Sequence, residues 1–253
     1  MTRTVLPGAE PFELGDGPTG VVVIHGFTGT PQAVKPLAER LARRQMRVVA
    51  PLLPGHGTRW EELNRAGAAD WRAAVEDAYD RAVAGRDEVF MVGLSFGGTL
   101  ALDFAARHPG RVAGVVTLAG LVHTRDLRRF IAPLLKYLVR SVPGISNDIA
   151  DNSVRELAYD RLPAAGAHQM LKVVKETRRA LPMVECPLLV VHSPRDHTVG
   201  VHNAKVIRKR VSSKEVRVEY LEHSYHVLTL DRERERVNEL TYGFIKEHSR
   251  HAV

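Results

Sequence analysis

The residues best suited to covalent chemistry form the sequence Gly-Leu-Ser-Phe-Gly at 93–97. An apolar run at 89–92 precedes it and a helix-compatible run follows it, which predicts a tight turn from strand to helix. Such a turn strains the serine backbone and exposes its hydroxyl above the sheet, and the glycines avoid collisions with the neighbouring strand and helix. The pattern predicts a nucleophilic Ser95; the alternative is a glycine-rich turn with a structural role alone.

A serine hydroxyl is a poor nucleophile at neutral pH unless a histidine takes its proton and a carboxylate orients that histidine. Around a turn of this kind the chain order is serine, acid, histidine, and the acid and the base each follow a strand. Asp196 follows the apolar run at 188–191, and His226 follows the run at 216–220 and precedes the last helix. We therefore expect Asp196 to be the acid and His226 the general base.

Other titratable residues compete for these roles. Asp126 begins an amphipathic stretch and fits a helix cap better. His223 comes too soon after its strand, His192 lies at a strand end, and His202 lies on the following helix, with His197 also close in sequence. No His-Glu-x-x-His or other compact metal-ligand pattern occurs, so we expect no metal and no other cofactor.

The tetrahedral intermediate of acyl transfer needs donors aimed at its oxyanion, worth about 3 kcal/mol each in other serine hydrolases. We expect one donor to be the backbone N–H of Phe96, directly after the serine. The second comes from the loop at 25–29, where small residues let the backbone approach the substrate, and we choose the N–H of Phe27. His25 in this loop and His56 in the turn at 54–57 are interpreted as structural.

Alternating strands and helices must position these residues. Short apolar runs predict strands at 21–24, 48–50, 89–92, 112–118, 188–191 and 216–220. Helical spacing of apolar residues predicts helices at about 34–42, 71–82, 96–107, 203–210 and 232–248, with Asp70 as a cap. This alternation predicts an α/β fold with a mostly parallel central sheet and helices on both faces.

The stretch at 122–182 interrupts the alternation, because it has no convincing strand and is helical where it is periodic. We expect one domain over 1–253, with a small helical cap inserted at 122–182. One face of the stretch at 127–139 is apolar and could line an acyl tunnel above Ser95, or simply pack on the body. The other face carries Arg125, Arg128, Arg129, Lys136 and Arg140, and could make transient contact with a lipid interface.

The composition is that of a globular protein, with 44% hydrophobic and 26% charged residues among 253. The single cysteine, Cys186, excludes an internal disulfide and is interpreted as a buried small hydrophobe. No run reaches the roughly 18 apolar residues of a membrane span, and no signal peptide is recognisable, so we expect a cytoplasmic protein. The net charge is +7, but the basic residues alternate with acids, which favours surface solvation and no nucleic-acid partner.

Together these residues resemble the α/β-hydrolase family, and within it the small bacterial carboxylesterases and monoacylglycerol lipases. The resemblance covers nearly the whole chain and is more specific than the serine motif alone. Its motifs are His-Gly-Phe-Thr-Gly-Thr-Pro at 25–31, Pro-Gly-His-Gly-Thr at 54–58, Asp-Trp at 70–71, Gly-Leu-Ser-Phe-Gly-Gly-Thr at 93–99, Glu-Leu-Ala-Tyr at 156–159, Cys-Pro at 186–187, Arg-Asp-His-Thr-Val at 195–199 and Ser-Tyr-His-Val at 224–227. It implies an α/β-hydrolase fold with Ser95 as nucleophile, Asp196 as acid, His226 as base, and Phe27 and Phe96 as oxyanion donors.

The resemblance also implies substrate contacts and shows one departure. Phe96 stands where bacterial monoacylglycerol lipases of this type commonly carry methionine, and its larger ring could reshape the acyl or alcohol pocket. Glu156 and Asn152 match cap positions that contact the glycerol end, with helix capping and surface solvation as the alternative for both. The candidate apolar contacts are Ile145, Phe130 and Leu134.

The expected function is therefore hydrolysis of carboxylic monoesters with a medium or long acyl chain through an acyl-enzyme on Ser95. Monoacylglycerols are the first candidate among these small-molecule substrates. The alternatives are a general carboxylesterase for short-chain or aromatic esters, acyl transfer or thioester hydrolysis, and a hydrolase-fold binding protein without catalysis. The sequence leaves the oligomeric state open.

Overall fold

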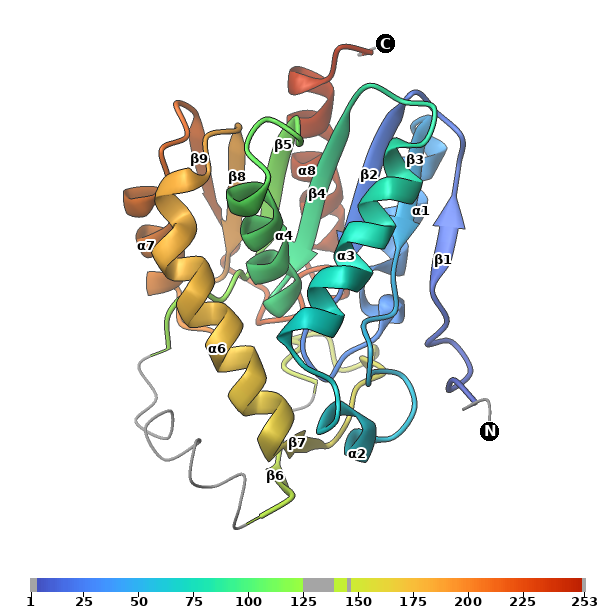
Figure 1. Cartoon of the computed structure of the whole chain (residues 1–253), viewed down its shortest axis with the longest axis vertical. Helices are drawn as coiled ribbons and strands as arrows, with labels where there is room; N and C mark the ends of the chain where they lie inside the picture. The colour runs from blue at the N-terminus through green and yellow to red at the C-terminus, as the bar shows by residue number, and fades with distance from the viewer. Residues whose placement is uncertain (1–3, 125–138, 145–146, 252–253) are drawn as a thin grey trace.

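A seven-stranded sheet forms the centre of the molecule in the computed structural model, which describes residues 4–124, 139–144 and 147–251 (Figure 1). The strand order is β1-β3-β2-β4-β5-β8-β9, and every neighbouring pair is parallel except β1 and β3. The expected α/β fold with a mostly parallel sheet is confirmed. The strands are β1 (Phe12–Leu14), β2 (Thr19–Ile24), β3 (Met46–Ala50), β4 (Val89–Leu94), β5 (Gly114–Leu118), β8 (Leu188–His192) and β9 (Val216–Tyr220).

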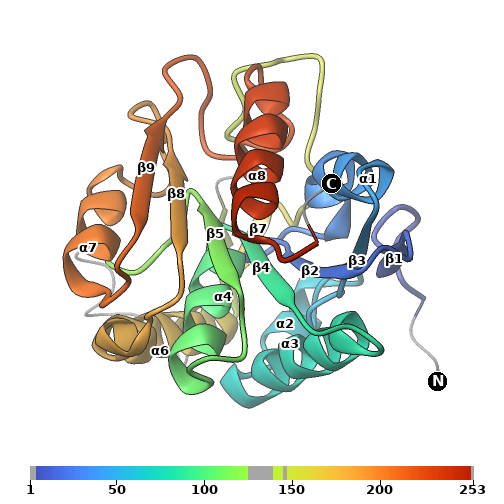
Figure 2. The same ribbon diagram turned by 90° about the horizontal axis from the view of Figure 1, so that it is seen from above.

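Helices cover both faces of this sheet (Figure 2). One face carries α1 (Lys35–Arg43) and α8 (Arg234–His248). The other carries α3 (Ala68–Val83), α4 (Phe96–Arg107), α6 (Ala164–Ala180) and α7 (His202–Arg210). Because both faces are covered, β2 and β4 are buried along their whole length, as continuous apolar runs predict. Within the described ranges, no helix is both long enough and apolar enough to cross a membrane.

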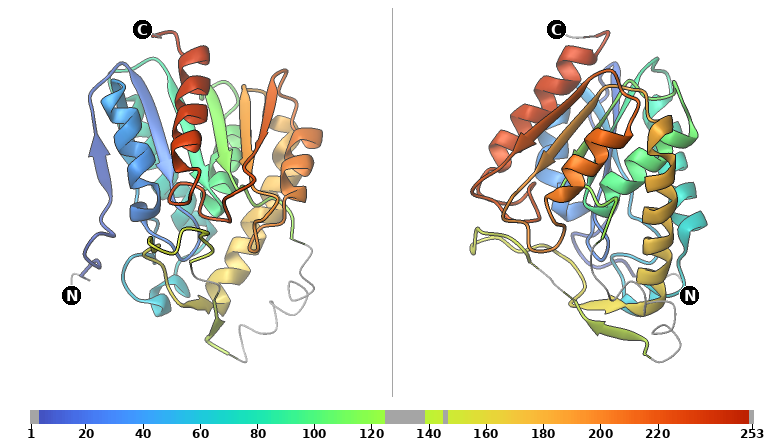
Figure 3. Two further views of the ribbon diagram at one scale, coloured as in Figure 1. Left: turned by 180° about the vertical axis from the view of Figure 1, so that it is seen from behind. Right: turned by 90° about the vertical axis from the view of Figure 1, so that its left-hand side faces the viewer.

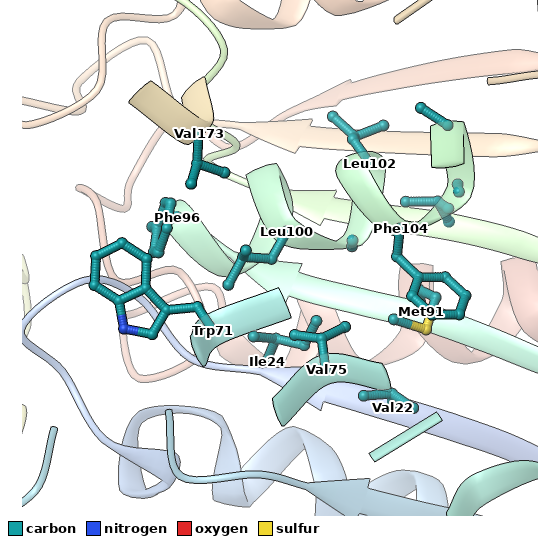
Figure 4. Packing of buried hydrophobic residues seen from close by; sticks show 14 of the residues in the cluster. Val22, Ile24, Trp71, Val75, Met91, Phe96, Leu100, Leu102, Phe104 and Val173 are labelled. Atoms are coloured by element: carbon teal, nitrogen blue, oxygen red, sulfur yellow. The ribbon is translucent and has the colours of Figure 1, made fainter. Parts of the chain in front are cut away.

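The core between the sheet and α3, α4 and α6 supports the end of the sheet at which the serine lies. Trp71 of α3 and Phe96 of α4 are fully buried there, with ring centroids 5.2 Å apart in an edge-to-face arrangement. Figure 4 shows Val173 of α6 beside Phe96, so three helices meet at this point. The packing fixes the start of α4 against the sheet.

The predicted elements agree with the structure where apolar periodicity is strong. α4 spans Phe96–Arg107 and β9 spans Val216–Tyr220, with the same bounds as the sequence predicts. β1 was not predicted, because three edge residues give no periodic signal. Asp70 is not the cap residue of α3: it is the third helical residue, and its carboxylate accepts a hydrogen bond from the N–H of Gly67 at 2.8 Å.

The prediction that 122–182 contains no strand is wrong. β6 (Ser141–Pro143) and β7 (Arg161–Pro163) pair antiparallel in a separate two-stranded sheet. Each strand has three residues and ends in proline, so its sequence carries little strand signal. α6 then runs along α4 in the layer that covers the main sheet, and the segment between β6 and β7 crosses near the carboxyl ends of the main strands (Figure 3). The helical cap at 122–182 remains a prediction, and its stretch at 125–138 lies outside the described residues.

Candidate active site

Ser95 occupies the junction between β4 and α4 in an unusual backbone conformation. Its φ is 55° and its ψ is −117°, and its N–H donates to the Leu118 carbonyl in β5 at 2.7 Å. A positive φ of this kind costs a non-glycine residue about 1–3 kcal/mol and persists only where the surroundings impose it. The strained strand-to-helix turn that the sequence predicts is therefore present.

The glycines beside Ser95 are required by close backbone contacts. A Cβ on Gly93 would lie 2.2 Å from the carbonyl oxygen of Gly97. A Cβ on Gly97 would lie 2.2 Å from the carbonyl oxygen of Ile24 in β2. The expectation that side chains here would collide with neighbouring elements is confirmed.

Asp196 and His226 meet through a hydrogen bond between the loops after β8 and β9. The distance from His226 Nδ1 to Asp196 Oδ2 is 2.8 Å, and both side chains are almost fully shielded from solvent. The other carboxylate oxygen, Oδ1, accepts the N–H groups of Thr198 at 2.8 Å and Val199 at 2.7 Å. Because an ionised carboxylate only accepts, Nδ1 carries the proton and Nε2 of His226 is left as the basic nitrogen.

The electrostatics of the pair follow from burial and mutual charge. Burial by itself would raise the pKa of Asp196, but the charge of His226 and hydrogen bonds from His192, His226 and Val199 outweigh it and hold that pKa well below its usual range. Burial likewise opposes protonation of His226, but the charge and hydrogen bond of Asp196, assisted by the charges of Glu156 and Asp148, raise its pKa above the usual value. The arrangement stabilises an imidazolium beside a carboxylate.

Ser95 and His226 both line a cavity of about 580 Å³ at the carboxyl edge of the sheet. No hydrogen bond joins the Ser95 hydroxyl and the His226 ring within the described part of the chain. β6, β7 and the first turns of α6 supply an apolar wall of the cavity, formed by Val142, Pro143, Leu162, Ala167, Met170 and Leu171. A polar wall is formed by His123 and Thr124 of the loop after β5 and by His202 and Asn203 at the start of α7.

The loop after β2 approaches Ser95 closely. A Cβ on Gly26 would lie 3.3 Å from the Cβ of Ser95, so the backbone of this loop comes within reach of the serine. Neither the N–H of Phe27 nor that of Phe96 donates a hydrogen bond to any described residue. His25 holds the loop: its Nε2 accepts the N–H of Leu53 at 3.1 Å, and its Nδ1–H donates to the Gly26 carbonyl at 2.9 Å. The structural interpretation of His25 is confirmed.

The ring of Phe96, which stands in place of the family's common methionine, packs in the core, and its effect on the shape of the cavity stays a prediction. The side chain is fully buried and does not line the cavity. Its ring packs edge-to-face on Trp71 and on Phe27, with the Phe27 centroid 5.9 Å away. The ring is therefore held between α3 and the loop after β2.

The competing histidines have other environments. His223 is exposed on the surface, whereas His192 is fully buried, with its Nε2 2.8 Å from the Val199 carbonyl and 3.4 Å from Asp196 Oδ2. His197 contacts Asp148, and His202 lines the cavity. His56 is buried and donates from Nδ1 to the Leu53 and Pro54 carbonyls, which supports its structural interpretation. Sequence reasoning missed the contact of His192 with Asp196, for which the sequence has no local signal.

The predicted substrate contacts separate into three groups. Glu156 lines the cavity beside Gly29, and burial raises its pKa to about 6 despite the opposing charge of His226. Asn152 is exposed and does not line the cavity. Ile145, Phe130 and Leu134 lie outside the described residues, as does the rival acid Asp126.

Two remaining sequence inferences concern metal binding and the cysteine. Among the described residues, no group of three His, Cys, Asp or Glu side chains is arranged to hold a metal ion. The thiol of Cys186 is free and partly buried, and burial raises its pKa to about 11. The thiol is therefore protonated at neutral pH and lies apart from the cavity.

Known proteins are similar to this chain in both sequence and fold. The Hydrolase_4 family model, described as "Serine aminopeptidase, S33", matches residues 18–233. The chain is 38% identical over 247 residues to the thermostable monoacylglycerol lipase of Bacillus sp. (strain H-257), with 97% of each protein covered. It is 27% identical to the carboxylesterase of Bacillus subtilis (strain 168), with 94% of this chain and 96% of the relative covered.

A solved structure agrees with these sequence comparisons. It comes from the work on LipS and LipT, two metagenome-derived lipolytic enzymes, and matches with a TM-score of 0.94 at 36% identity. The match covers 97% of this chain and all of that one. The similarity therefore extends over the sheet, the helices and the loops of the cavity, well beyond the serine motif. This chain belongs to the serine aminopeptidase S33 family of α/β-hydrolases and is a serine hydrolase of the carboxylesterase and monoacylglycerol lipase type.

Proposed function

We propose that Ser95, Asp196 and His226 form a catalytic triad that hydrolyses carboxylic esters through an acyl-enzyme. The 2.8 Å hydrogen bond between His226 Nδ1 and Asp196 Oδ2 carries this proposal, because it leaves Nε2 basic in the cavity that Ser95 also lines. The free N–H groups of Phe27 and Phe96 support it, since they are suited to hold an oxyanion beside the serine. The serine and histidine need to approach only when substrate is bound.

The reaction follows from these roles in two halves. His226 Nε2 takes the Ser95 proton while Oγ attacks the ester carbonyl carbon, and the two N–H groups hold the oxyanion. When the intermediate collapses, the bond to the alcohol oxygen breaks and His226 returns the proton to that oxygen. Water then attacks the acyl-enzyme with His226 again as base, which releases the acid and restores Ser95. Asp196 stabilises the imidazolium in both halves. The proposed reaction uses only these side chains, the two N–H groups and water.

The substrate we propose is a monoester with a medium or long acyl chain, monoacylglycerols first. The apolar wall formed with β6, β7 and α6 is suited to an acyl chain, and the names of the Bacillus sp. relative and of the lipolytic enzymes support this choice. Glu156 would accept hydrogen bonds from hydroxyl groups of the alcohol, because a carboxylate in a cavity can accept several hydrogen bonds. Phe130 and Leu134, from the apolar face predicted for the stretch at 127–139, and Ile145 remain proposed acyl contacts.

A general carboxylesterase is the second candidate, supported by the Bacillus subtilis relative. The cytoplasmic location, the lack of a nucleic-acid partner and a transient lipid contact of the cap remain predictions. Of the basic residues named for that contact, Arg140 is described and exposed.

Turnover by wild type and Ser95→Ala, measured with p-nitrophenyl esters of increasing chain length, tests the mechanism. We expect the variant to lose about six orders of magnitude in kcat, as in other serine hydrolases, with its unfolding temperature unchanged. We also expect a fluorophosphonate to label wild type but not Ser95→Ala. Near wild-type turnover by Ser95→Ala would refute the triad.

A second set of substrates separates the candidate functions. Mono-, di- and triacylglycerols, short-chain esters and an aminoacyl p-nitroanilide are compared by kcat/KM. Preference for monoacylglycerols is expected, and a preference for short-chain or aromatic esters would favour the general carboxylesterase. Preference for the anilide would contradict an esterase.

A further inference from the structure

The segment 147–151, which lies between β6 and β7, contacts both loops of the proposed acid and base. The carbonyl oxygen of Asp148 accepts the N–H of His226 at 2.9 Å and the N–H of Val227 at 3.2 Å. The N–H of the proposed base is therefore bonded directly to this segment, whereas its carbonyl accepts the N–H of Leu228 in its own β9–α8 connection at 2.9 Å. Since a histidine ring follows its backbone, the segment helps to set where the ring lies.

The side chain of the same residue binds the loop of the proposed acid. Asp148 Oδ2 accepts the N–H of His197 and the hydroxyl of Thr198, both at 3.0 Å. Asp148 Oδ1 lies 2.8 Å from His197 Nδ1, and the carboxylate is only 7% exposed. His197 and Thr198 directly follow Asp196, so one aspartate joins the acid loop through its side chain to the base loop through its backbone.

A second aspartate fastens the same segment from the other side. Asp231, which is fully buried, accepts the N–H groups of Ala150 at 2.9 Å and Asp151 at 3.1 Å. It also accepts the N–H of Tyr225 at 2.6 Å, one residue before the proposed base. His226 is thus held between two points at which segment 147–151 is tied to its loop.

The two loops have further contacts that do not involve this segment. At their bases the hydroxyl of Ser193 donates to the carbonyl of Ser224. Nearer the tips the ring of Tyr225 packs on Arg195 and on His197, with centroids 4.5 Å apart in the second case. Two hydrogen bonds also join the loops directly, from Arg195 to the Tyr225 hydroxyl at 3.4 Å and between Asp196 and His226. Asp148 adds hydrogen bonds from a third segment to both loops.

We propose that Asp148 is a positioning residue that clamps the acid loop and the base loop together and so sets the geometry between Asp196 and His226. The proposal rests on the catalytic roles proposed above and goes beyond them, because it gives Asp148, in segment 147–151 between β6 and β7, a part in setting the geometry of the reacting groups. Movement of that segment would change the position of the base as well as access to the cavity.

Charge gives the clamp a second effect that can be measured. The charged groups that act on His226 are Asp196 from the β8 loop and Glu156 and Asp148 from the β6–β7 segment, and each raises the pKa of His226. His197 is the titratable group bonded to Asp148 itself. Because His226 must be neutral to act as base, activity falls as pH drops through its pKa. Loss of the Asp148 charge lowers that pKa, so the acid limb of kcat/KM should move to lower pH.

Asp148→Ala and Asp148→Asn separate the geometric effect from the charge effect. We expect Asp148→Ala to lower kcat about tenfold to a hundredfold with KM within about twofold, because a misplaced base costs rate and not binding. Asp148→Asn keeps acceptor and shape and should recover most of kcat while retaining the shifted acid limb. Asp151→Asn is the matched control, since its carboxylate bonds Ser153 and Arg234 and does not act on His226; it should keep the wild-type kcat and pH profile.

Fluorophosphonate titration gives the number of competent sites, so that kcat is expressed per folded enzyme. Wild-type kcat and acid limb in folded Asp148→Ala would overturn the clamp, whereas activity in Ser95→Ala would instead overturn the proposed function. A lower unfolding temperature with unchanged kcat per site would show a structural role alone and also reject the proposal. If Asp148→Ala does not fold, the acid limb of Asp148→Asn decides, and an unshifted limb rejects the proposal.

Discussion

The active site is built by two regions with opposite construction. The sheet carries Ser95, Asp196 and His226 directly after β4, β8 and β9. The sequences of these three strands are continuous or alternating apolar runs. The described part of the segment between β5 and α6 has two three-residue strands that end in proline, and it is joined to the body largely by polar hydrogen bonds. Burial fixes the first region, whereas in the second individual hydrogen bonds act beside a few buried side chains such as Ile149.

In the proposed reaction, the two regions have different roles: one carries the groups that react, and the other sets their pKa, their position and the substrate preference. Groups that form or break bonds in the proposed reaction come from the sheet, where a one-residue change of register would move them completely. Glu156, Asp148 and one half of the apolar wall, formed by Val142, Pro143 and Leu162, come from the segment between β5 and α6, here called the covering segment. There they would set substrate preference, the pKa of the base and its position. Variants in the sheet should therefore abolish catalysis or folding, and variants in the segment should change parameters by smaller factors.

Asp196→Asn is expected to give the largest effect that tests this division. An amide in place of the carboxylate offers His226 a donor as well as an acceptor and no longer imposes the tautomer with Nδ1–H. We expect kcat to fall by about 10³–10⁴ with little change in KM, as for the same substitution in other triads. Steady-state kinetics with p-nitrophenyl butyrate gives both values. A loss below tenfold would remove Asp196 from the triad.

The same division explains what the sequence predicts and what it does not. The bounds of α4 and β9, and the meeting of Asp196 with His226, follow from periodicity and from the rule that parallel strands end at one edge. These features depend on patterns within about ten residues plus one topological rule. β6 and β7 have no such pattern, because proline ends both strands.

The missed parts of the site depend on contacts between distant residues. Asp148 and His197 are 49 positions apart, and neither residue type nor spacing distinguishes Asp148 from other surface aspartates. The direction of the Phe96 ring was also beyond the sequence, since a motif specifies the backbone turn but not which neighbours are left to receive the ring. The buried contact of His192 with Asp196 has the same origin, because it depends on how the loop after β8 folds back.

Trp71→Ala should have the next largest effect, and on stability more than on chemistry. The fully buried ring supports Phe27 and Phe96, and its Nε1–H donates to the Pro54 carbonyl at 3.0 Å. We expect the free energy of unfolding to fall by about 3–5 kcal/mol in urea titrations. Trp60→Ala is the control, because the other tryptophan is half-buried in α2 (Trp60–Leu63) beside Arg161. Equal losses in the two variants would contradict the expectation that the fully buried ring stabilises the body more than the half-buried ring beside β7 does.

Glu156→Gln tests the covering segment, with a smaller effect. Its pKa, raised from 4.5 to about 6, means that the folded protein binds an extra proton between these values. Stability should therefore fall as pH rises through this window, by roughly 1–2 kcal/mol, and the variant should lose this dependence. The variant should raise KM for a monoacylglycerol several-fold but change kcat/KM for p-nitrophenyl butyrate little at alkaline pH. Equal effects on both substrates would exclude selective contact with the alcohol.

Asp70→Ala should give the smallest effect, because it removes one exposed hydrogen bond from a helix that burial already fixes. Its carboxylate accepts the N–H of Gly67 at the first turn of α3, and such a contact is worth about 0.5–1 kcal/mol. Asp77→Ala, on the same helix, removes an exposed ion pair with Arg81 and should cost less. Thermal unfolding measures both, and kcat should not change. A lower kcat in Asp70→Ala would mean that the start of α3 affects the position of the reacting groups. The body would then also set active-site geometry, a role assigned here to the covering segment.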